Sequence, residues 1–329
     1  MSEVTEQEEQ APEGGSESGL EPTGQVVSRT PWQVFWFRFR KDKAAIFGLV
    51  CIAVILFMAI FAGVIAKNVV HHAPNEVFLR EMTDSLGLPK GPNSQFWFGG
   101  DRAGRDLFVR VLYWARVSLT VALLATGIAV VIGVALGLAA GFYRGKVDTV
   151  ISRLTDVVMT LPVLLLALGL VSACGATQQG CLGGLLRPGV VLVILVIGFF
   201  SWPYIARIVR GQVMSLREKE FVEASKAMGS GGSRIMAREV LPNLVAPIIV
   251  YTTLIIPNNI LFEAALSFLG LGVPPTTPSW GAMLSEASAV FTVAWWMMLF
   301  PGLFLFFTTL AFNLVGDGLR DALDPRTGR

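Results

Sequence analysis

The segment that comes nearest to a catalytic motif in this sequence is GFYRGKV at residues 141–147. A phosphate-binding loop needs the pattern GxxxxGK[ST], in which backbone amides and a lysine hold the phosphates of a nucleotide. Gly145 and Lys146 would satisfy its end, but Ala140 stands where the first glycine is required and Val147 where a serine or threonine is required. The sequence therefore predicts that this chain does not hydrolyse ATP itself.

The other residue types of enzyme active sites are also scarce. The only histidines, His71 and His72, are adjacent, so a zinc-binding HExxH motif is impossible, and no GxSxG serine motif occurs. We therefore expect no catalytic centre, no metal site and no cofactor-binding site in this chain.

The composition indicates that lipid, rather than water, surrounds this chain. Of 329 residues, 53% are hydrophobic and only 15% are charged, whereas about 25% of the residues of soluble domains are charged. So few charged side chains cannot cover the surface of so large an apolar core. A net charge of +2 gives no reason to expect nucleic acid as a partner.

The apolar residues are concentrated in six blocks, each close to the ~20 residues that a helix needs to cross a bilayer. Glu263 is the only ionisable residue inside any of them. A transmembrane barrel would show alternating segments of about ten residues, and the continuous apolar runs contradict that. We expect an all-α integral membrane protein with six transmembrane helices at 46–66, 117–142, 157–173, 188–206, 244–266 and 291–315.

The N-terminal region divides into two parts. Residues 1–28 hold seven glutamates and no lysine or arginine, so we expect a disordered acidic tail without a cleavable signal peptide. Residues 29–45 place aromatic residues at helical spacing beside basic ones, the pattern of a helix at the cytoplasmic headgroup level. A plain start to the first spanning helix is the alternative. The residues of this pattern are Trp32, Phe35, Trp36, Phe39, Arg38, Arg40, Lys41 and Lys43.

The distribution of basic residues predicts the side on which each loop lies. With the N-terminus inside, the inner segments hold 18 of the 26 lysines and arginines, as the positive-inside rule requires. Both termini and the loop at about 207–243 are then cytoplasmic. Residues 67–116 form an extracytoplasmic loop, and a membrane domain follows over 117–329.

Two of the three cysteines could form a disulfide. Cys174 and Cys181 bracket the short outer segment CGATQQGC, whereas Cys51 lies in the first apolar block. An oxidising exterior would allow the pair to be bridged. Two free thiols at helix ends are the alternative, and the sequence does not decide between them.

Three polar residues interrupt the fifth apolar block, namely Asn258, Asn259 and Glu263. Asn259 and Glu263 are four apart and share one helix face. They are candidates to line an aqueous path for a polar solute, or else to hold the bundle together through interhelical hydrogen bonds. Because self-powered carriers use several buried ionisable groups, a single one argues against a proton-driven pump. A stand-alone channel or secondary carrier is the rival class.

The second apolar block carries a glycine stripe at Gly133, Gly137 and Gly141. Small residues at intervals of four let another helix approach closely. The stripe therefore predicts close helix packing, not a functional site.

The loop at 207–243 contains the segment EFVEASKAMGSGGSRIMAREVLPN, which resembles the EAA loop of ABC importer permeases. The family's usual isoleucine is replaced by Glu239, and a serine stands for the second alanine. The matching residues are Glu223, Ala224, Ser225, Gly229, Leu241 and Pro242.

The same loop is expected to form a helix at 221–228, a turn at 229–233 and a second short helix at 235–241, ended by Pro242. The resemblance implies that this protrusion docks on an ATPase and moves the attached helices. A solvated basic connector is the alternative.

Further segments narrow the resemblance to the C-type subunit of the dipeptide, oligopeptide and nickel permease group. They are FGGDRAGRDLFVRVLYWARVSL, GFYRGKVDTVISRLTDVVMTLPVLLLAL, EAALSFLGLGVPPTTPSWGAMLSEA and FNLVGDGLRDALDPR, and the similarity covers roughly residues 30–326. The DRAGRD motif at 101–106 is expected either near the dock of a binding protein or in plain salt-bridged structure.

The resemblance implies a type I ABC importer permease fold in the bacterial plasma (inner) membrane. Its partners would be a second, B-type permease subunit, two cytosolic ABC ATPase subunits that bind ATP and Mg²⁺, and an extracytoplasmic solute-binding protein. The chain itself would hold no cofactor. The solute would be a di- or oligopeptide, with a nickel chelate or a haem-type solute as the alternative.

Overall fold

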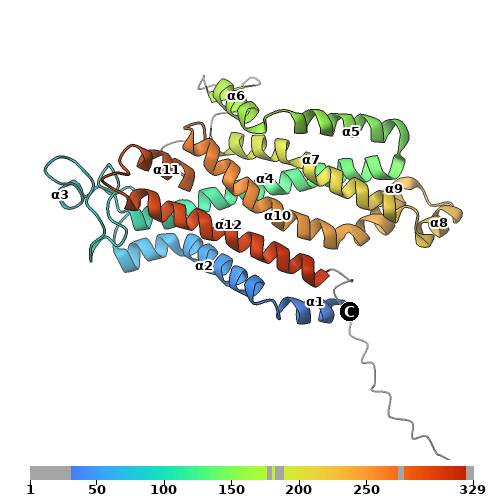
Figure 1. The fold of residues 1–329 in the computed structure, drawn as a ribbon, viewed down its shortest axis with the longest axis horizontal. Coiled ribbons are helices and arrows are strands. Elements are labelled where there is room, and N and C mark those ends of the chain that lie inside the picture. Colours follow the sequence, from blue (N-terminus) through green and yellow to red (C-terminus); the bar gives the residue numbers. More distant parts are fainter. Residues whose placement is uncertain (1–30, 176–179, 182–188, 273–277, 324–329) are drawn as a thin grey trace, which may run out of the picture.

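The computed structural model describes residues 31–175, 180–181, 189–272 and 278–323, which are largely helical (Figure 1). Two isolated β-bridges, Thr83–Pro89 and Gly100–Asp106, are the strand-like pairings described there. The expected tail at 1–28 and the side chain of Trp32 lie outside the described part. The helices are α1 (Pro31–Phe39), α2 (Lys43–Ile65), the π-helical η1 (Ala66–Val70), α3 (Leu79–Met82), α4 (Leu107–Tyr143), α5 (Gly145–Thr160), α6 (Val163–Gly175), α7 (Val190–Leu216), α8 (Glu220–Ala227), α9 (Gly232–Ile235), the π-helical η3 (Met236–Val240), α10 (Leu241–Phe268), α11 (Trp280–Ser288) and α12 (Trp296–Leu323).

Five helical runs in the described residues are long and apolar enough to cross a membrane, and a sixth span is complete if α5 and α6 count as one. The predicted all-α membrane fold is confirmed, and the expected third span is corrected. The third span is not the single run expected at 157–173, because α5 and α6 meet at Leu161 and Pro162 with a bend of 83°. Proline lacks an amide donor and disfavours helical geometry in the residue before it. Leu161 is accordingly extended, with φ −78° and ψ 139°.

The segment 67–116, expected to be an extracytoplasmic loop, is helical at both of its ends. The π-helical turn η1 carries the first span to Val70, and α4 begins at Leu107 instead of at 117. Asp106 is the N-cap of α4, and its carboxylate accepts hydrogen bonds from two amides of the first turn at 2.9 and 3.3 Å. Because this cap satisfies amides that would otherwise lack partners, the helix can start among charged residues.

The DRAGRD motif at 101–106 forms buried, salt-bridged structure. Asp101 is 1% exposed, and its carboxylate accepts a hydrogen bond from Arg105 Nε at 2.6 Å and pairs with Arg110 Nε at 3.2 Å. Arg105 also reaches Glu286 of α11 at 3.5 Å. These contacts favour the structural interpretation of the motif, since its charges tie the start of α4 to α11.

The contact between α4 and α7 lies at the centre of the bundle. Gly133, Gly137 and Gly141 of α4 face α7 closely. A Cβ atom on Gly137 would lie 2.7 Å from the carbonyl oxygen of Ala206, and one on Gly141 would lie 2.7 Å from Cβ of Val213. The glycine stripe is therefore a packing face, as the sequence predicts.

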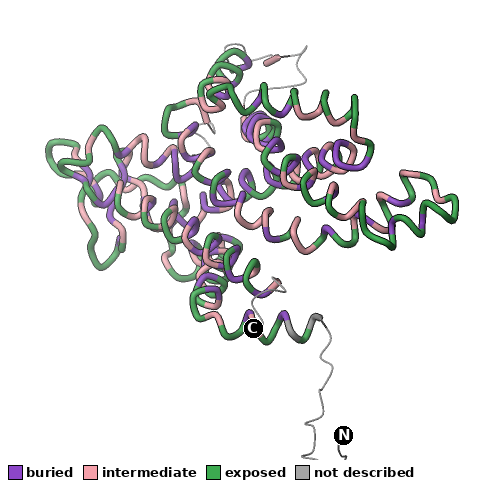
Figure 2. The backbone as a smooth tube through the Cα atoms, turned by 45° about the vertical axis from the view of Figure 1, so that its right-hand side comes forward, coloured by how far each residue is buried: buried purple, intermediate pink, exposed green. Residues whose placement is uncertain are grey.

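The bundle has two distinct ends and an apolar outer surface. The outer segment with α3 and α11 lies at one end, and α8 and α9 lie at the opposite end (Figure 1). Buried and exposed residues alternate along the helices, so that each helix turns one face to the bundle (Figure 2). Phe57, Ile60 and Val131 on the outward faces are 57%, 65% and 69% exposed. Such a surface is typical of a protein surrounded by lipid.

The glycine contact can be tested by adding one methyl group. We expect Gly137→Ala to destabilise the chain by about 1–3 kcal/mol, because the new Cβ must push α4 and α7 apart. Gly127 lies on the same helix, and no atom lies within 4 Å of the place where its Cβ would stand. Gly127→Ala is therefore the control and should be neutral or slightly stabilising. Thermal unfolding in detergent, followed by circular dichroism, measures both, and equal unfolding temperatures would contradict the close contact.

Candidate functional site

The end of the bundle opposite the outer segment carries a helical protrusion, formed by α8 and α9 (Figure 1). Val222 of α8 belongs to the same buried hydrophobic cluster as Ile235 and Val240, and Ser225 is also buried. The rest of α8 is exposed. The helix α8 is therefore amphipathic, with one face buried against the bundle and the other face exposed.

The predicted docking residues lie on both faces of this protrusion. Glu223 and Ala224 are exposed, whereas Ser225 is buried. Gly229 follows α8 with φ of +80°, a left-handed conformation that favours glycine. The exposed face of α8 is therefore the accessible surface of the loop. The left-handed conformation of Gly229 sets the direction of the chain after α8.

Pro242 does not end the second short helix of the loop, contrary to expectation. The helices α9, η3 and α10 form one run over Gly232–Phe268, in which Leu241 is half-buried and Pro242 exposed. Pro242 lies in the first turn of α10, a position that tolerates proline. The π-helical turn η3 precedes it and shifts the hydrogen-bond register at this place. The protrusion is therefore joined directly to the fifth span.

Two polar contacts fix the segment between α7 and α8 to the corner between α4 and α5. Arg217 Nη1 donates to the carbonyl oxygen of Phe142 at 2.6 Å, and the Arg144 guanidinium pairs with Glu218. The hydrogen bond from Arg144 lowers the pKa of the Glu218 carboxyl, so this carboxyl is ionised at neutral pH. From the sequence, Arg144 and Arg217 can be recognised only as basic residues of the predicted inner loops. Their partners, Glu218 and the carbonyl of Phe142, lie 74 and 75 residues away along the chain.

Two ion pairs hold α5 against α7. Asp148 pairs with Arg210 through two contacts, one of them 2.7 Å between Arg210 Nη2 and Asp148 Oδ2, and Asp156 pairs with Arg207 at 2.9 Å. Arg207, Arg210 and Asp156 line a cavity of about 210 Å³ between α4, α5 and α7. No sequence motif indicates these pairs, since each joins two different helices.

Asn258 and Asn259 line a second cavity, of about 300 Å³, between α7, α10 and the break between α5 and α6. Asn259 is 2% exposed; Ser201 Oγ donates to its Oδ1, and its Nδ2 donates to Thr126 Oγ1, both at 2.8 Å. Asn258 is exposed. Asn259 therefore joins α10 to α7 and α4, and Asn258 is the more accessible amide of the cavity wall.

Glu263 does not line this cavity. Its side chain is fully buried, Ser267 Oγ donates to its Oε1 at 2.6 Å, and the hydroxyls of Ser118 and Ser279 lie beside it. Glu263 therefore connects α10 with α4 and the start of α11, which is the interhelical alternative. Helical spacing places Asn259 and Glu263 on one face, but it does not distinguish an enclosed face from one that lines a cavity.

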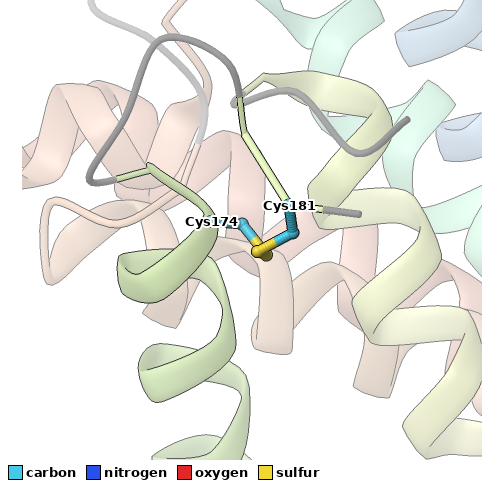
Figure 3. Close-up of a disulfide and its surroundings, with 2 residues drawn as sticks. All are labelled: Cys174 and Cys181. Carbon is cyan, nitrogen blue, oxygen red and sulfur yellow. A yellow bond between two sulfur atoms is a disulfide. The ribbon is translucent and has the colours of Figure 1, made fainter. Parts of the chain in front are cut away.

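The structure joins Cys174, near the end of α6, to Cys181 through a disulfide with a Cα–Cα distance of 4.8 Å (Figure 3). Cys174 is fully buried, and Cys51 in α2 is free. The bridge ties Cys181 to the C-terminal end of α6. It requires an oxidising compartment, which agrees with the outer position predicted for this segment.

A bundle of apolar helices with an exposed protrusion at one end and cavities between its spans is typical of a membrane permease. Comparison with known families gives the same class. Residues 133–329 match the family described as binding-protein-dependent transport system inner membrane component, and the chain belongs to this family. It is a multi-pass permease subunit of an ABC importer in the bacterial inner membrane, and the ATPase activity of such importers resides in partner subunits.

Two further matches define the group within this family. Residues 30–86 match the N-terminal TM domain of oligopeptide transport permease C. Over 298 residues, 91% of each chain, the protein is 42% identical to the glutathione transport system permease protein GsiD of Escherichia coli O6:K15:H31 (strain 536 / UPEC) and to that of Shigella boydii serotype 4 (strain Sb227). The chain is a C-type permease of the oligopeptide and dipeptide importer group, as its motifs predict.

The disulfide can be tested by counting thiols. We expect alkylation of the denatured, unreduced chain to modify only Cys51, because the other two of the three cysteines are bridged. After reduction, intact-mass spectrometry should show three modified cysteines. Three modified cysteines in a sample that was never reduced would show that no bridge forms in the membrane-inserted chain.

Proposed function

We propose that this permease forms half of a translocation pathway for short peptides, with the tripeptide glutathione as the first candidate solute. The observation that carries the proposal is the 42% identity to glutathione permeases over 91% of both chains. The match of residues 30–86 to a domain of an oligopeptide permease supports the same solute class. A nickel chelate or a haem-type solute is the alternative within the family.

The cavity beside Asn258 is the part of the chain best suited to such a solute. Its volume of about 300 Å³ is near the lower limit of small-molecule sites, and a second permease subunit would enlarge it. A peptide presents amide donors and acceptors, which an asparagine side chain can bind with its own acceptor and donor. Pro162 lies at the break between α5 and α6, and Pro203 and Pro257 lie inside α7 and α10. Because a proline inside a helix removes one backbone hydrogen bond, these cavity walls can change shape more readily than helices without proline.

Coupling to ATP hydrolysis would pass through α8. Its exposed face, with Glu223 and Ala224, is available to an ATPase surface. Its buried face rests on the helices that continue into the fifth span, and Arg217 holds the preceding segment to α4. Movement of α8 would therefore displace α7 and α10, which line the cavity. A solvated connector would not account for this buried face.

The family implies in general a second permease, ATPase subunits and a binding protein. We propose a B-type permease subunit, two cytosolic ATPase subunits that hold ATP and Mg²⁺, and an extracytoplasmic solute-binding protein, with no cofactor in this chain. A stand-alone channel or secondary carrier is the rival class. Such a protein would purify without ATPase subunits and would take up solute without ATP.

Coupling can be tested by changing the exposed face of α8 and the turn after it. We expect Glu223→Arg and Gly229→Pro each to reduce ATP-driven uptake by at least about tenfold, equivalent to ~1.4 kcal/mol of lost interaction. The first change reverses a charge on the docking face. The second imposes φ near −65° where the chain needs +80°. Uptake of labelled glutathione or dipeptide into proteoliposomes that hold the complete importer measures the effect.

Matched controls separate coupling from damage to the protein. Glu81→Arg makes the same charge change at an exposed residue of α3, at the opposite end of the bundle. Gly231 has φ −67° and no atom within 4 Å of a Cβ position, so Gly231→Ala should transport normally. Unchanged uptake in Glu223→Arg and Gly229→Pro would remove the coupling role from α8.

The solute path can be tested at Asn258. We expect Asn258→Leu to lower peptide uptake by about tenfold, or ~1.4 kcal/mol, because it removes the accessible amide and leaves the hydrogen bonds of Asn259 in place. Asn313→Leu is the control, since Asn313 is exposed on α12 and does not line the cavity. The readout is the initial rate of uptake with the binding protein present. Equal rates in the two variants would place the path elsewhere.

A further inference from the structure

The short helix α1 has no part in the proposed transport steps, yet it is docked firmly on the bundle. Phe35 and Phe39 are 9% and 4% exposed and belong to one buried cluster with Val315 and Ala322 of α12. One face of α1 therefore covers the inner end of α12, and the other face is exposed.

A capped break separates α1 from the first span. Asp42 is extended, with φ −80° and ψ 102°, and its Oδ1 accepts hydrogen bonds from the amides of Ala44 and Ala45 at 2.9 and 3.1 Å. α1 is therefore a separate helix and not a plain start to the span. Asp42 is the only acidic residue between 31 and 43, and its carboxylate is engaged in this helix cap.

The other face of α1 pairs exposed aromatic rings with cations. Trp36 and Phe37 are 42% and 46% exposed. The Arg40 guanidinium lies over the Trp36 ring at 5.6 Å from its centroid, and the Lys41 ammonium lies over the Phe37 ring at 4.1 Å. Aromatic rings of this kind lie at the boundary between acyl chains and headgroups, and basic side chains reach from there to the phosphates.

The position of these cations along the chain agrees with headgroup depth. Phe47 and Val50 of α2 are 52% and 54% exposed, so lipid contact begins about one helical turn, ~6 Å, after Lys43. Arg40 and Lys41 precede that point and are exposed. The inner leaflet of bacterial and other membranes carries anionic lipids, which attract basic segments beside the first span.

We propose that Arg40 and Lys41, positioned by Trp36 and Phe37, bind the phosphates of anionic phospholipids in the inner leaflet. The site anchors α1, and through it the inner end of α12, to the membrane surface. Because it uses none of the cavity or α8 residues, it is independent of the proposed solute and coupling.

The test counts lipids on the full-length chain in detergent micelles by native mass spectrometry, with added phosphatidylglycerol or phosphatidylcholine. We expect phosphatidylglycerol to bind more tightly, and Arg40→Gln/Lys41→Gln to weaken its binding by at least about tenfold, given roughly fivefold for each basic residue. Lys67→Gln/Lys90→Gln removes the same charge at the opposite end, where both lysines are exposed, and should retain full binding. Trp36→Ala keeps both cations and should also weaken binding, because Arg40 loses the ring that positions it.

Several results would overturn the proposal. Unchanged phosphatidylglycerol binding in Arg40→Gln/Lys41→Gln, or an equal loss in the lysine control, would show that these cations form no site. Displacement of the lipid by glycerol 1-phosphate would indicate a site for free anions. Lipid binding that appears only after deletion of residues 1–28 would show that the acidic tail occupies the surface instead.

Discussion

The close approach of α4 and α7 is the constraint on which the rest of the structure depends. The two helices lie so close that a Cβ added to Gly137 or Gly141 of α4 would stand 2.7 Å from an atom of α7. The helices therefore cannot separate or rotate without losing this contact. With 37 residues, α4 is about 55 Å long. It starts after its N-cap Asp106 in the outer segment and ends beside Arg144, which pairs with Glu218 just before α8. This helix pair therefore connects the two ends of the protein mechanically.

The opposite side of the bundle is more weakly held. α5 and α6 bend by 83° at Pro162, and α7 and α10 carry Pro203 and Pro257 near the cavity. α5 meets α7 through the pair of Asp148 and Arg210, whose side chains are 18% and 33% exposed. A second pair joins Asp156 and Arg207, whose side chains are 52% and 54% exposed. Exposed pairs of this kind contribute only about 0–1 kcal/mol. A rigid α4–α7 contact beside a loosely held cavity wall is the arrangement that a gated pathway needs.

Much of the fold could be predicted because lipid imposes a simple rule on sequence: every lipid-facing stretch must be apolar and helical. The first span, expected at 46–66, begins at Lys43, and the glycine stripe packs as expected. The errors arise where one side chain decides a boundary. Asp106 starts α4 ten residues early by capping it, Pro162 divides the third span, and Pro242 is accepted in the first turn of α10. The EAA-like segment could be located from its spacing, but not the buried face of α8.

The sequence by itself determined the class of protein, most of its spans, the orientation that the positive-inside rule favours and the segment that resembles an ATPase dock. Only the tertiary structure decided what each polar residue does. Asn259 meets Thr126 and Ser201, which lie 133 and 58 residues away, and Glu263 is enclosed although it shares a helix face with Asn259. The physical reason is that periodicity reports which side chains share a face of one helix, whereas hydrogen bonds in the bundle join faces of different helices.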